Sequence, residues 1–183
     1  SDKCSSPVQI GALSVWSKVS SQRAQGCAAI RTAGSLWTWG NNSSGKLGLN
    51  DTSNRSSPVQ VGTLTNWKQA SMGGDQCLAI KTDGTLWSWG DNNRGQLGLN
   101  IQAGYFSYNR SSPVQVGALT NWAQISSGSA SCAAVKTDGT LWSWGANQHG
   151  QLGINTADVY GATGADRSSP VQIGALTTWK QVS

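Results

Sequence analysis

The chain has 183 residues and carries 13 Lys and Arg against 8 acidic residues, which gives a formal net charge of +5. Every acidic residue is Asp, only 11% of the residues are charged, and 23 are Gly and 10 are Trp. Because helices favour Glu, Lys, Arg and Met over Gly, Ser, Asn and Thr, this composition argues against helical bundles, coiled coils and helix-rich α/β enzymes. The sequence also has no apolar run of about 18 residues, so no membrane-spanning helix is predicted.

Copies of the pentapeptide Ser-Ser-Pro-Val-Gln divide the chain into repeats. They begin at Ser5, Ser56, Ser111 and Ser168, and all 4 prolines lie in them. Residues 56–100 align without gaps to 111–155, with 32 of 45 positions identical. A fixed-order repeat of roughly 50 residues indicates a propeller or a solenoid. We expect one domain over residues 1–183, with repeats near 5–55, 56–110, 111–167 and an incomplete 168–183.

Each repeat is predicted to form short antiparallel strands. In the second repeat, in chain order, the expected strands are 67–72, 76–81, 86–90 and 113–116. Asp83-Gly84 lies between the second and third strands and predicts a type I′ hairpin, because Asp and Gly tolerate positive φ angles. Pro113 is expected to start the fourth strand, where a missing backbone donor is tolerated. Such four-stranded units match the blades of a β-propeller.

Two stretches, TDGTLWSWGDNNRGQLGLN (82–100) and TDGTLWSWGANQHGQLGIN (137–155), share the core WG-x-N-x-x-GQLG. A more divergent copy, TAGSLWTWGNNSSGKLGLN, covers 32–50. This core resembles the repeat of the regulator of chromosome condensation family, and the resemblance covers nearly the whole chain. It implies an all-β propeller, seven-bladed in the best-known members. It implies less about activity, because one fold hosts many unrelated functions.

The repeats present do not close a propeller. The chain begins with an expected fourth strand at 7–10 and ends in an expected first strand at 179–183, so complete strand sets begin only at Trp16, Trp67 and Trp122. A ring takes at least about four blades. Blades without neighbours would expose apolar faces and open edges. We therefore expect a fragment of a larger propeller, with the rest of the ring or another chain covering these faces.

The cysteines predict neither a disulfide framework nor a metal site. Cys27, Cys77 and Cys132 occupy the same place in the second strand of successive repeats, and Cys4 lies outside the pattern. We expect the three to be buried, unpaired thiols, because equivalent positions in rotated blades are too far apart for a disulfide. The chain has no Cys-x-x-Cys and 1 His, so no metal and no cofactor are expected.

The tryptophans form two sets that recur in every repeat. A Trp-x-Trp pair stands in each third strand and one Trp begins each first strand; the pairs are Trp37/Trp39, Trp87/Trp89 and Trp142/Trp144, and the single residues are Trp16, Trp67, Trp122 and Trp179. Strict recurrence favours packing between blades, with both members of each pair mostly buried. An aromatic platform for sugars or bases is the alternative.

No catalytic constellation recurs with the repeat. The GxSxG, P-loop and HExxH motifs are absent, and no acidic pair has the spacing of acid–base catalysis. His149 is replaced by Arg94 and Ser44 in the other repeats, so the repeat does not require it. We expect the chain not to be an enzyme.

The best candidate partner contacts lie in connections of variable length. Segments 101–109 and 156–166 hold the aromatic residues that fall outside the repeat pattern: Tyr105, Phe106, Tyr108 and Tyr160. Aromatic residues in such loops are common in recognition surfaces. We predict that both loops project from one region and contact another chain or the missing part of the propeller. Packing against a neighbouring blade is the alternative.

The leading functional hypothesis is a non-catalytic structural or protein-interaction module. Basic residues such as Arg31, Lys81 and Lys136 are isolated, so we expect solvated surface charges rather than a nucleic-acid patch. The resemblance also suggests guanine-nucleotide exchange on a small GTPase, inhibition of an enzyme by a propeller, or chromatin binding. The Glu-free composition resembles extracellular, cell-surface or virion proteins of bacterial systems more than nuclear ones.

Overall fold

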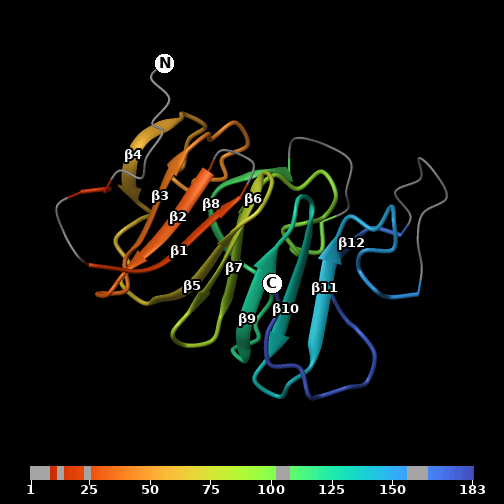
Figure 1. The fold of residues 1–183 in the computed structure, drawn as a ribbon. Helices are drawn as coiled ribbons and strands as arrows, with labels where there is room; N and C mark the ends of the chain where they lie inside the picture. Colours follow the sequence, from red (N-terminus) through yellow and green to blue (C-terminus); the bar gives the residue numbers. More distant parts are fainter. Residues whose placement is uncertain (1–8, 12–14, 23–25, 102–107, 156–164) are drawn as a thin grey trace.

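The computed structural model describes residues 9–11, 15–22, 26–101, 108–155 and 165–183. Within these ranges the chain forms three four-stranded antiparallel sheets and no α-helix. Each sheet takes its strands in chain order, and the three sheets follow one another across the molecule (Figure 1). We call them blades 1, 2 and 3. The predicted all-β architecture of about three four-stranded propeller blades is confirmed.

The strands of the three blades occupy equivalent stretches of sequence. Blade 1 contains β1 (Trp16–Gln22), β2 (Gly26–Arg31), β3 (Leu36–Gly40) and β4 (Arg55–Gln60). Blade 2 contains β5 (Trp67–Met72), β6 (Gln76–Lys81), β7 (Leu86–Gly90) and β8 (Arg110–Gln115). Blade 3 contains β9 (Trp122–Ser127), β10 (Ser131–Lys136), β11 (Leu141–Gly145) and β12 (Arg167–Gln172).

The fourth strand is longer than predicted, and its proline lies inside it. β8 begins at Arg110, so Pro113 does not start the strand as expected. β8 pairs only with β7, and the register shifts between Ser88 and Gly90. An edge strand with an irregular register tolerates a residue that lacks a backbone donor. The proline is therefore accommodated by the edge and the register shift rather than by the strand end.

The hairpin between the second and third strands is not the predicted type I′ turn. Among the described residues of this turn only Gly84 has a positive φ, of 79°, so Asp83 does not take the left-handed conformation. The amide of Gly84 donates to Lys81 O at 3.0 Å, and that of Lys81 donates to Thr85 O at 3.0 Å. This pattern fits a three-residue loop closed by a left-handed glycine. Asp83 instead accepts hydrogen bonds from the amide and hydroxyl of Thr85, at 3.0 and 2.7 Å.

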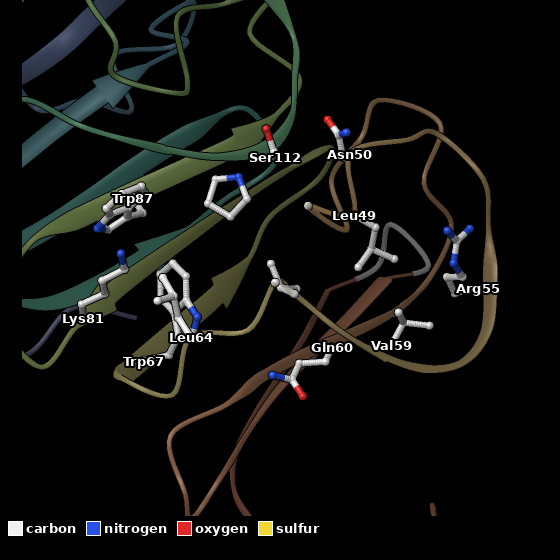
Figure 2. A pocket seen from close by; sticks show the side chains of 14 residues that line it. Leu49, Asn50, Arg55, Val59, Gln60, Leu64, Trp67, Lys81, Trp87 and Ser112 are labelled. Carbon is white, nitrogen blue, oxygen red and sulfur yellow. The ribbon is translucent and has the colours of Figure 1, made fainter.

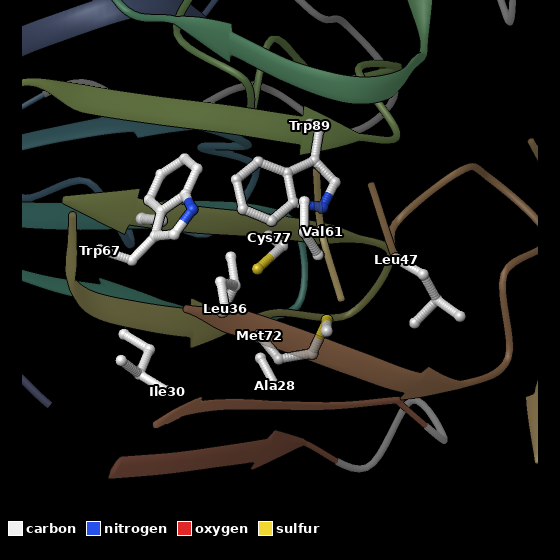
Figure 3. Close-up of a cluster of buried hydrophobic side chains, with 10 residues drawn as sticks. Ala28, Ile30, Leu36, Leu47, Val61, Trp67, Met72, Cys77 and Trp89 are labelled. Carbon is white, nitrogen blue, oxygen red and sulfur yellow. The ribbon is translucent and has the colours of Figure 1, made fainter. Parts of the chain in front are cut away.

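Hydrophobic cores lie between neighbouring blades. The core between blades 1 and 2 consists of Ala28, Ile30, Leu36, Leu47, Val61, Trp67, Met72, Cys77, Ala79 and Trp89 (Figure 3). The core between blades 2 and 3 consists of Leu78, Ile80, Leu86, Val116, Trp122, Ile125, Cys132, Ala134 and Trp144. Blade 2 lies between the other two blades and contributes residues to both cores. Its strand β6 is therefore buried along its whole length.

A hydrogen bond joins the third strand of each later blade to a turn of the blade before it. Trp89 Nε1 donates to the carbonyl of Lys46 at 2.9 Å, and Trp144 Nε1 donates to that of Gln96 at 2.9 Å. The indole lies so close to the turn that a Cβ at Gly48 would come within 2.8 Å of Trp89 Nε1. Gly48 also has a φ of 72°, which L side chains rarely adopt. Glycine is therefore required there for two separate reasons.

The expected strands at the chain ends do not form as predicted. Trp179 begins like Trp67 and Trp122, since its amide donates to Gly139 O at 3.1 Å. Residues 179–183 nevertheless belong to no sheet, because no second strand pairs with them within the described ranges. The expected strand at 7–10 falls mostly outside the described residues, and Gln9 and Ile10 are in no strand. Across the described part of the chain no helix is long and apolar enough to cross a membrane.

Candidate functional site: the grooves between blades

Every blade builds the same group of two indoles and one cation. In blade 2 the rings of Trp67 on β5 and Trp87 on β7 meet edge to face, with their centroids 6.1 Å apart. Lys81 at the end of β6 places Nζ 5.1 Å from the centroid of Trp67 and 3.5 Å from that of Trp87. The equivalent groups are Arg31 with Trp16 and Trp37, and Lys136 with Trp122 and Trp142. A cation so placed is attracted by the negative faces of the rings.

The lysines of these groups are not the solvated surface charges expected from the sequence. Lys81 and Lys136 are each only 7% exposed. Burial lowers the pKa of Lys81, and the nearby carboxylate of Asp83 acts in the opposite direction. The pKa of Lys136 is lowered for the same reason, with Asp138 opposing. The prediction was wrong because it considered each lysine alone, whereas two tryptophans from other strands place their rings against its Nζ.

A groove opens beside this group at the boundary between blades 1 and 2. Its volume is about 490 Å³, and its walls include Leu49, Leu64, Trp67, Lys81, Trp87 and Pro113 (Figure 2). Leu64 is 47% exposed although it lies against this wall, so apolar surface faces solvent there. Apolar lining with a few polar groups is the usual character of a binding site.

The boundary between blades 2 and 3 carries an equivalent groove of about 390 Å³. Leu99, Leu119, Trp122, Trp142 and Pro170 take the places of Leu49, Leu64, Trp67, Trp87 and Pro113. The groove is therefore a property of the repeat and not of one loop.

Each groove lies next to unpartnered buried polar atoms. Trp67 Nε1 and Asn66 Oδ1 have no hydrogen-bond partner within the described structure, and the same holds for Trp122 Nε1 and Asn121 Oδ1. Buried polar groups are nearly always hydrogen-bonded, so an unmet donor and acceptor at matched positions call for an explanation. Trp67 and Trp122 themselves line the grooves, but their Nε1 atoms are buried below the surface.

The predicted aromatic contact residues are only partly described. Tyr105, Phe106 and Tyr160 lie outside the described residues, whereas Tyr108 is described and half-buried. The ends of both long connections are anchored, because Asn109 Oδ1 accepts from the amide of Asn92 at 3.0 Å and Asp166 Oδ1 accepts from that of Asn147 at 2.8 Å. The shared neighbourhood expected for the four aromatic residues stays a prediction.

One contact ties the 156–166 connection to blade 2. Arg94, in the turn region of blade 2, forms an ion pair with Asp166 at the end of the 156–166 connection, with Nη1 and Oδ2 3.4 Å apart. The Asp166 side chain is only 3% exposed, so this pair is held in place. The connections 101–109 and 156–166 follow the same glycine-rich turn in their repeats, and each is anchored at its end by an equivalent hydrogen bond.

The three described cysteines are unpaired, as predicted. Cys77 and Cys132 are buried, and burial raises the pKa of the Cys132 thiol to about 12 and also raises the pKa of Cys77. Cys27 is only half-buried, which corrects the expectation for that residue. Its side of blade 1 has no blade before it among the described residues. Those residues also contain no group of three or more His, Cys, Asp or Glu placed to hold a metal ion.

The Trp-x-Trp pairs are less buried than predicted. Trp89 and Trp144, the second members, are fully buried, but the first members Trp87 and Trp142 are half-buried at the grooves. Trp39 is a second member that is also half-buried. The prediction that both members of each pair are mostly buried is therefore correct only for Trp89 and Trp144, whereas Trp87 and Trp142 line surface grooves.

Sequence reasoning also missed an ion pair that fastens blade 1 to blade 2. Lys46 stands where the later repeats have Gln96 and Gln151, and its Nζ lies 3.0 Å from Asp75 Oδ1 and 3.1 Å from Gly74 O. The Lys46 side chain is buried whereas that of Asp75 is exposed. The signal that could have found it was the charged replacement in an otherwise neutral turn.

Comparison with solved structures finds propellers that this chain resembles in fold. Yeast Prp20p from Saccharomyces cerevisiae, described with its binding to Gsp1p and histones, shares 20% identity with a TM-score of 0.74, over 91% of this chain and 40% of that one. Yeast RCC1 (Prp20) bound by Kap60 shares 22% sequence identity with a TM-score of 0.74, over 93% of this chain and 40% of that one. Human WBSCR16 shares 21% sequence identity with a TM-score of 0.71, over 86% of this chain and 37% of that one. The chain thus spans about 40% of the yeast structures.

The family models are more specific than the structural likeness. The comparison with curated protein sequences finds no match. The regulator of chromosome condensation (RCC1) repeat matches residues 33–80, 83–135 and 138–183, and a second model of the same repeat matches 67–96 and 122–151. These matches cover most of the chain, and the first two each run from the third and fourth strands of one blade into the first and second strands of the next. The chain therefore belongs to the regulator of chromosome condensation repeat family.

Proposed function

We propose that the chain is a non-catalytic protein-interaction module whose inter-blade grooves bind an extended segment of a protein partner. The observation that carries the proposal is the repetition of one groove, built from equivalent residues, at both blade boundaries. A partner segment that crosses two grooves gains from both, because linked contacts act as one multivalent interaction.

The chemistry of the groove suits a protein segment. The half-buried ring of Trp87 and the exposed side chain of Leu64 offer apolar surface. Lys81 adds positive charge at the same wall. Tryptophan is common among the residues that dominate protein interfaces. Acidic residues flanked by apolar ones would match this lining.

The structural neighbours support an interaction role in general terms. Prp20p is described with binding to Gsp1p and histones, and the second yeast structure contains Kap60. These partners belong to those proteins, and the present chain spans less than half of either. Guanine-nucleotide exchange, enzyme inhibition, and the cell-surface or virion location expected from composition all stay predictions that no contact in the described structure favours.

The proposal is tested by replacing the exposed leucine of both grooves with Asp, in the variant Leu64→Asp/Leu119→Asp. Leu176 occupies the equivalent place in the repeat, is 62% exposed, and lines neither of the two grooves. The matched control is therefore Leu176→Asp. Quantitative mass spectrometry of host proteins captured by each variant should show a partner that the double variant loses and the control retains. Equal capture by the double variant and the wild-type chain would remove the grooves from the functional account.

A further inference from the structure

Lys81 brings an ammonium group without an acceptor to the groove between blades 1 and 2. The residue is only 7% exposed and lines the wall of that groove (Figure 2). Its Nζ lies over the rings of Trp67 and Trp87 but donates no hydrogen bond to any described residue. Unlike Trp67 Nε1, this nitrogen keeps accessible surface, so a bound group can reach it. Because an ammonium carries three donors and buried polar groups are nearly always hydrogen-bonded, the groove wall contains an unmet cationic donor.

The nearby carboxylate of Asp83 does not meet this donor. It forms no ion pair with Lys81 in the described structure and instead accepts from the amide and hydroxyl of Thr85. Burial is the largest influence on the pKa of Lys81 and lowers it, so the surroundings disfavour the charged form. An anion bound at Nζ would favour that form again. The site therefore gains most from a negatively charged ligand group.

Arg55, the other cation in the described wall of this groove, is already matched. Its Nη2 is paired with the carboxylate of Asp51, and its Nη1 donates to the carbonyl of Ser53 at 2.7 Å. The groove thus offers one positive charge that no ion pair compensates. A carboxylate carries one negative charge, whereas a phosphorylated residue carries nearly two at pH 7 and would leave the excess unmatched. Charge complementarity therefore favours an Asp or Glu side chain.

The uncharged residues around Lys81 suit the rest of an extended peptide. Leu64 is 47% exposed and Trp87 is half-buried, so apolar surface lies beside the ammonium group. Gln60 and Ser112 line the same groove, and their side chains form no hydrogen bond with a described residue (Figure 2). A peptide backbone carries a donor and an acceptor at nearly every residue, which these side chains can meet. The groove can thus hold a carboxylate side chain together with an apolar neighbour.

The groove between blades 2 and 3 differs in charge. Lys136 lies against Trp122 and Trp142 as Lys81 does in blade 2, with Nζ 3.6 Å from the centroid of Trp142. Lys136 does not line this groove, however, and no described residue of the groove wall is charged. Leu119, 48% exposed, supplies apolar surface there. The two grooves therefore share an apolar wall but differ in the side chain that each one favours.

We propose, on the basis of the proposed function, that Lys81 binds the carboxylate of an Asp or Glu in the partner segment, whereas the groove between blades 2 and 3 binds an apolar side chain. A charge-assisted hydrogen bond between ammonium and carboxylate is about twice as strong as a neutral one. Because the blades follow one another across the molecule, a segment that crosses both grooves has its acidic and apolar anchors in a fixed order. Lys81 is then the residue that determines specificity.

The test begins with random peptides displayed on phage and selected on the 183-residue protein. Peptides that Leu64→Asp no longer binds are synthesised with both ends capped and with Glu, Gln or phosphoserine at the acidic position. Isothermal titration calorimetry measures the affinity of each. We expect Asp or Glu to be enriched at one position of the selected peptides. The Gln peptide should bind at least tenfold more weakly than the Glu peptide, and the phosphoserine peptide should bind no more tightly.

Variants of the lysine separate recognition of charge from the shape of the groove. Lys81→Met removes the charge from a side chain of similar length, and Lys81→Arg keeps it, as Arg31 does beside Trp16 and Trp37. Lys81→Met should weaken binding of the Glu peptide at least tenfold and leave the Gln peptide unchanged, whereas Lys81→Arg should retain the preference for Glu. The matched control Lys136→Met should bind both peptides like the wild-type chain. Circular dichroism confirms that each variant is folded.

The possible failures of the two proposals are distinguishable. Equal binding of the Glu and Gln peptides, equal losses of both peptides in Lys81→Met, or tighter binding of the phosphoserine peptide would overturn the role of Lys81 and leave the grooves as general peptide sites. If no peptide is selected, or if every selected peptide still binds Leu64→Asp/Leu119→Asp, the grooves do not bind peptides and both proposals fail.

Discussion

Trp89 Nε1 donates a hydrogen bond of 2.9 Å to the carbonyl of Lys46, a residue 43 positions earlier in the chain and in the preceding blade. The bond joins two features of the family repeat, the Trp-x-Trp strand and the glycine-rich turn, which lie next to each other in sequence but meet only across a blade boundary. Folding of one blade therefore prepares a binding site for the next.

The two equivalent glycines Gly48 and Gly153 should respond differently to alanine. Their φ angles, 72° and 66°, are nearly the same, so the backbone strain of a β-carbon is shared by both variants. Only Gly48→Ala places that carbon against an indole, and crowding in a packed site costs about 1–3 kcal/mol more. Urea denaturation at low protein concentration measures the difference, and equal losses of stability would show that the indole yields without cost.

Trp89→Ala should lower the free energy of unfolding by about 3–5 kcal/mol, as for other large aromatic truncations in cores. Trp39→Ala should cost much less, about 1 kcal/mol, because the Trp39 ring is half-buried and lies on an uncovered face. The pair is compared by chemical denaturation monitored through far-ultraviolet circular dichroism. A small effect at Trp89 would contradict its place in the core between blades 1 and 2.

Asp91→Asn should change how stability depends on pH. Burial raises the pKa of Asp91, so the native state holds this proton more tightly than the unfolded chain. The stabilising contribution of the protonated form is complete below the unfolded pKa, near 3.9, and is lost as the pH rises through the higher native value. The variant keeps an oxygen that can accept the hydrogen bond from Gln96 Nε2. Blade 1 already has Asn41 at the equivalent position, where its Oδ1 accepts from the Ser43 hydroxyl.

The measurement for this variant is the free energy of unfolding at several values between pH 3 and pH 7. Relative to the wild-type chain, Asp91→Asn should become progressively more stable as the pH rises, and a constant difference would contradict the assignment. Asp83→Asn provides a control of opposite sign, because hydrogen bonds from Thr85 hold the pKa of that carboxyl low.

The cysteines should differ in their reactivity towards a thiol reagent at pH 8. In a Cys4→Ser background Cys27 should react in the native state, because it is half-buried, whereas Cys77 and Cys132 should react only on unfolding. Burial raises the pKa of all three thiols, so the difference comes from the full burial of Cys77 and Cys132, which blocks access of the reagent. Mass spectrometry of the labelled peptides identifies the sites.

The long connections are tested by replacing Tyr105, Phe106 and Tyr108 with Ser together. If these aromatic residues bind a partner or another copy, assembly or capture should weaken while the thermal unfolding midpoint changes little. Replacement of Leu64 by Asp acts at the groove instead, so the two sets of variants separate the two surfaces. Unchanged assembly and unchanged capture in the triple variant would leave the connections without a role in recognition.

The strand pattern of the blades could be predicted because its signals are local. The ranges 67–72, 76–81 and 86–90 coincide with β5, β6 and β7, since glycine and asparagine turns separate apolar runs at those points. Exposure could not be predicted in the same way. Trp39 and Trp89 lie in nearly identical sequences, LWTWG and LWSWG, yet only Trp89 is fully buried, because its environment is supplied by the preceding blade.

The groove was missed for a related reason. A lysine such as Lys81 looks like a surface charge until the rings of Trp67 and Trp87, brought from two other strands, are placed around it. Trp67 Nε1 and Asn66 Oδ1 are buried without a hydrogen-bond partner in the described structure. The sequence could not predict this, because hydrogen bonding depends on which groups the fold brings close. Sequence patterns identified the residues of the candidate site but assigned them to packing and solubility.

Asn50, Asn100 and Asn155 share a left-handed backbone, with φ angles of 63°, 58° and 57°, and the amides of Asn50 and Asn100 donate to carbonyls of the next blade. Beyond them the chain runs through 51–54, 101–109 or 156–166 before the arginine that starts the fourth strand, so the spacer differs in length while the blade does not. The position after this asparagine is consequently a natural insertion point. Foreign peptides grafted there in successive blades would be displayed side by side, at a spacing fixed by the rotation between blades.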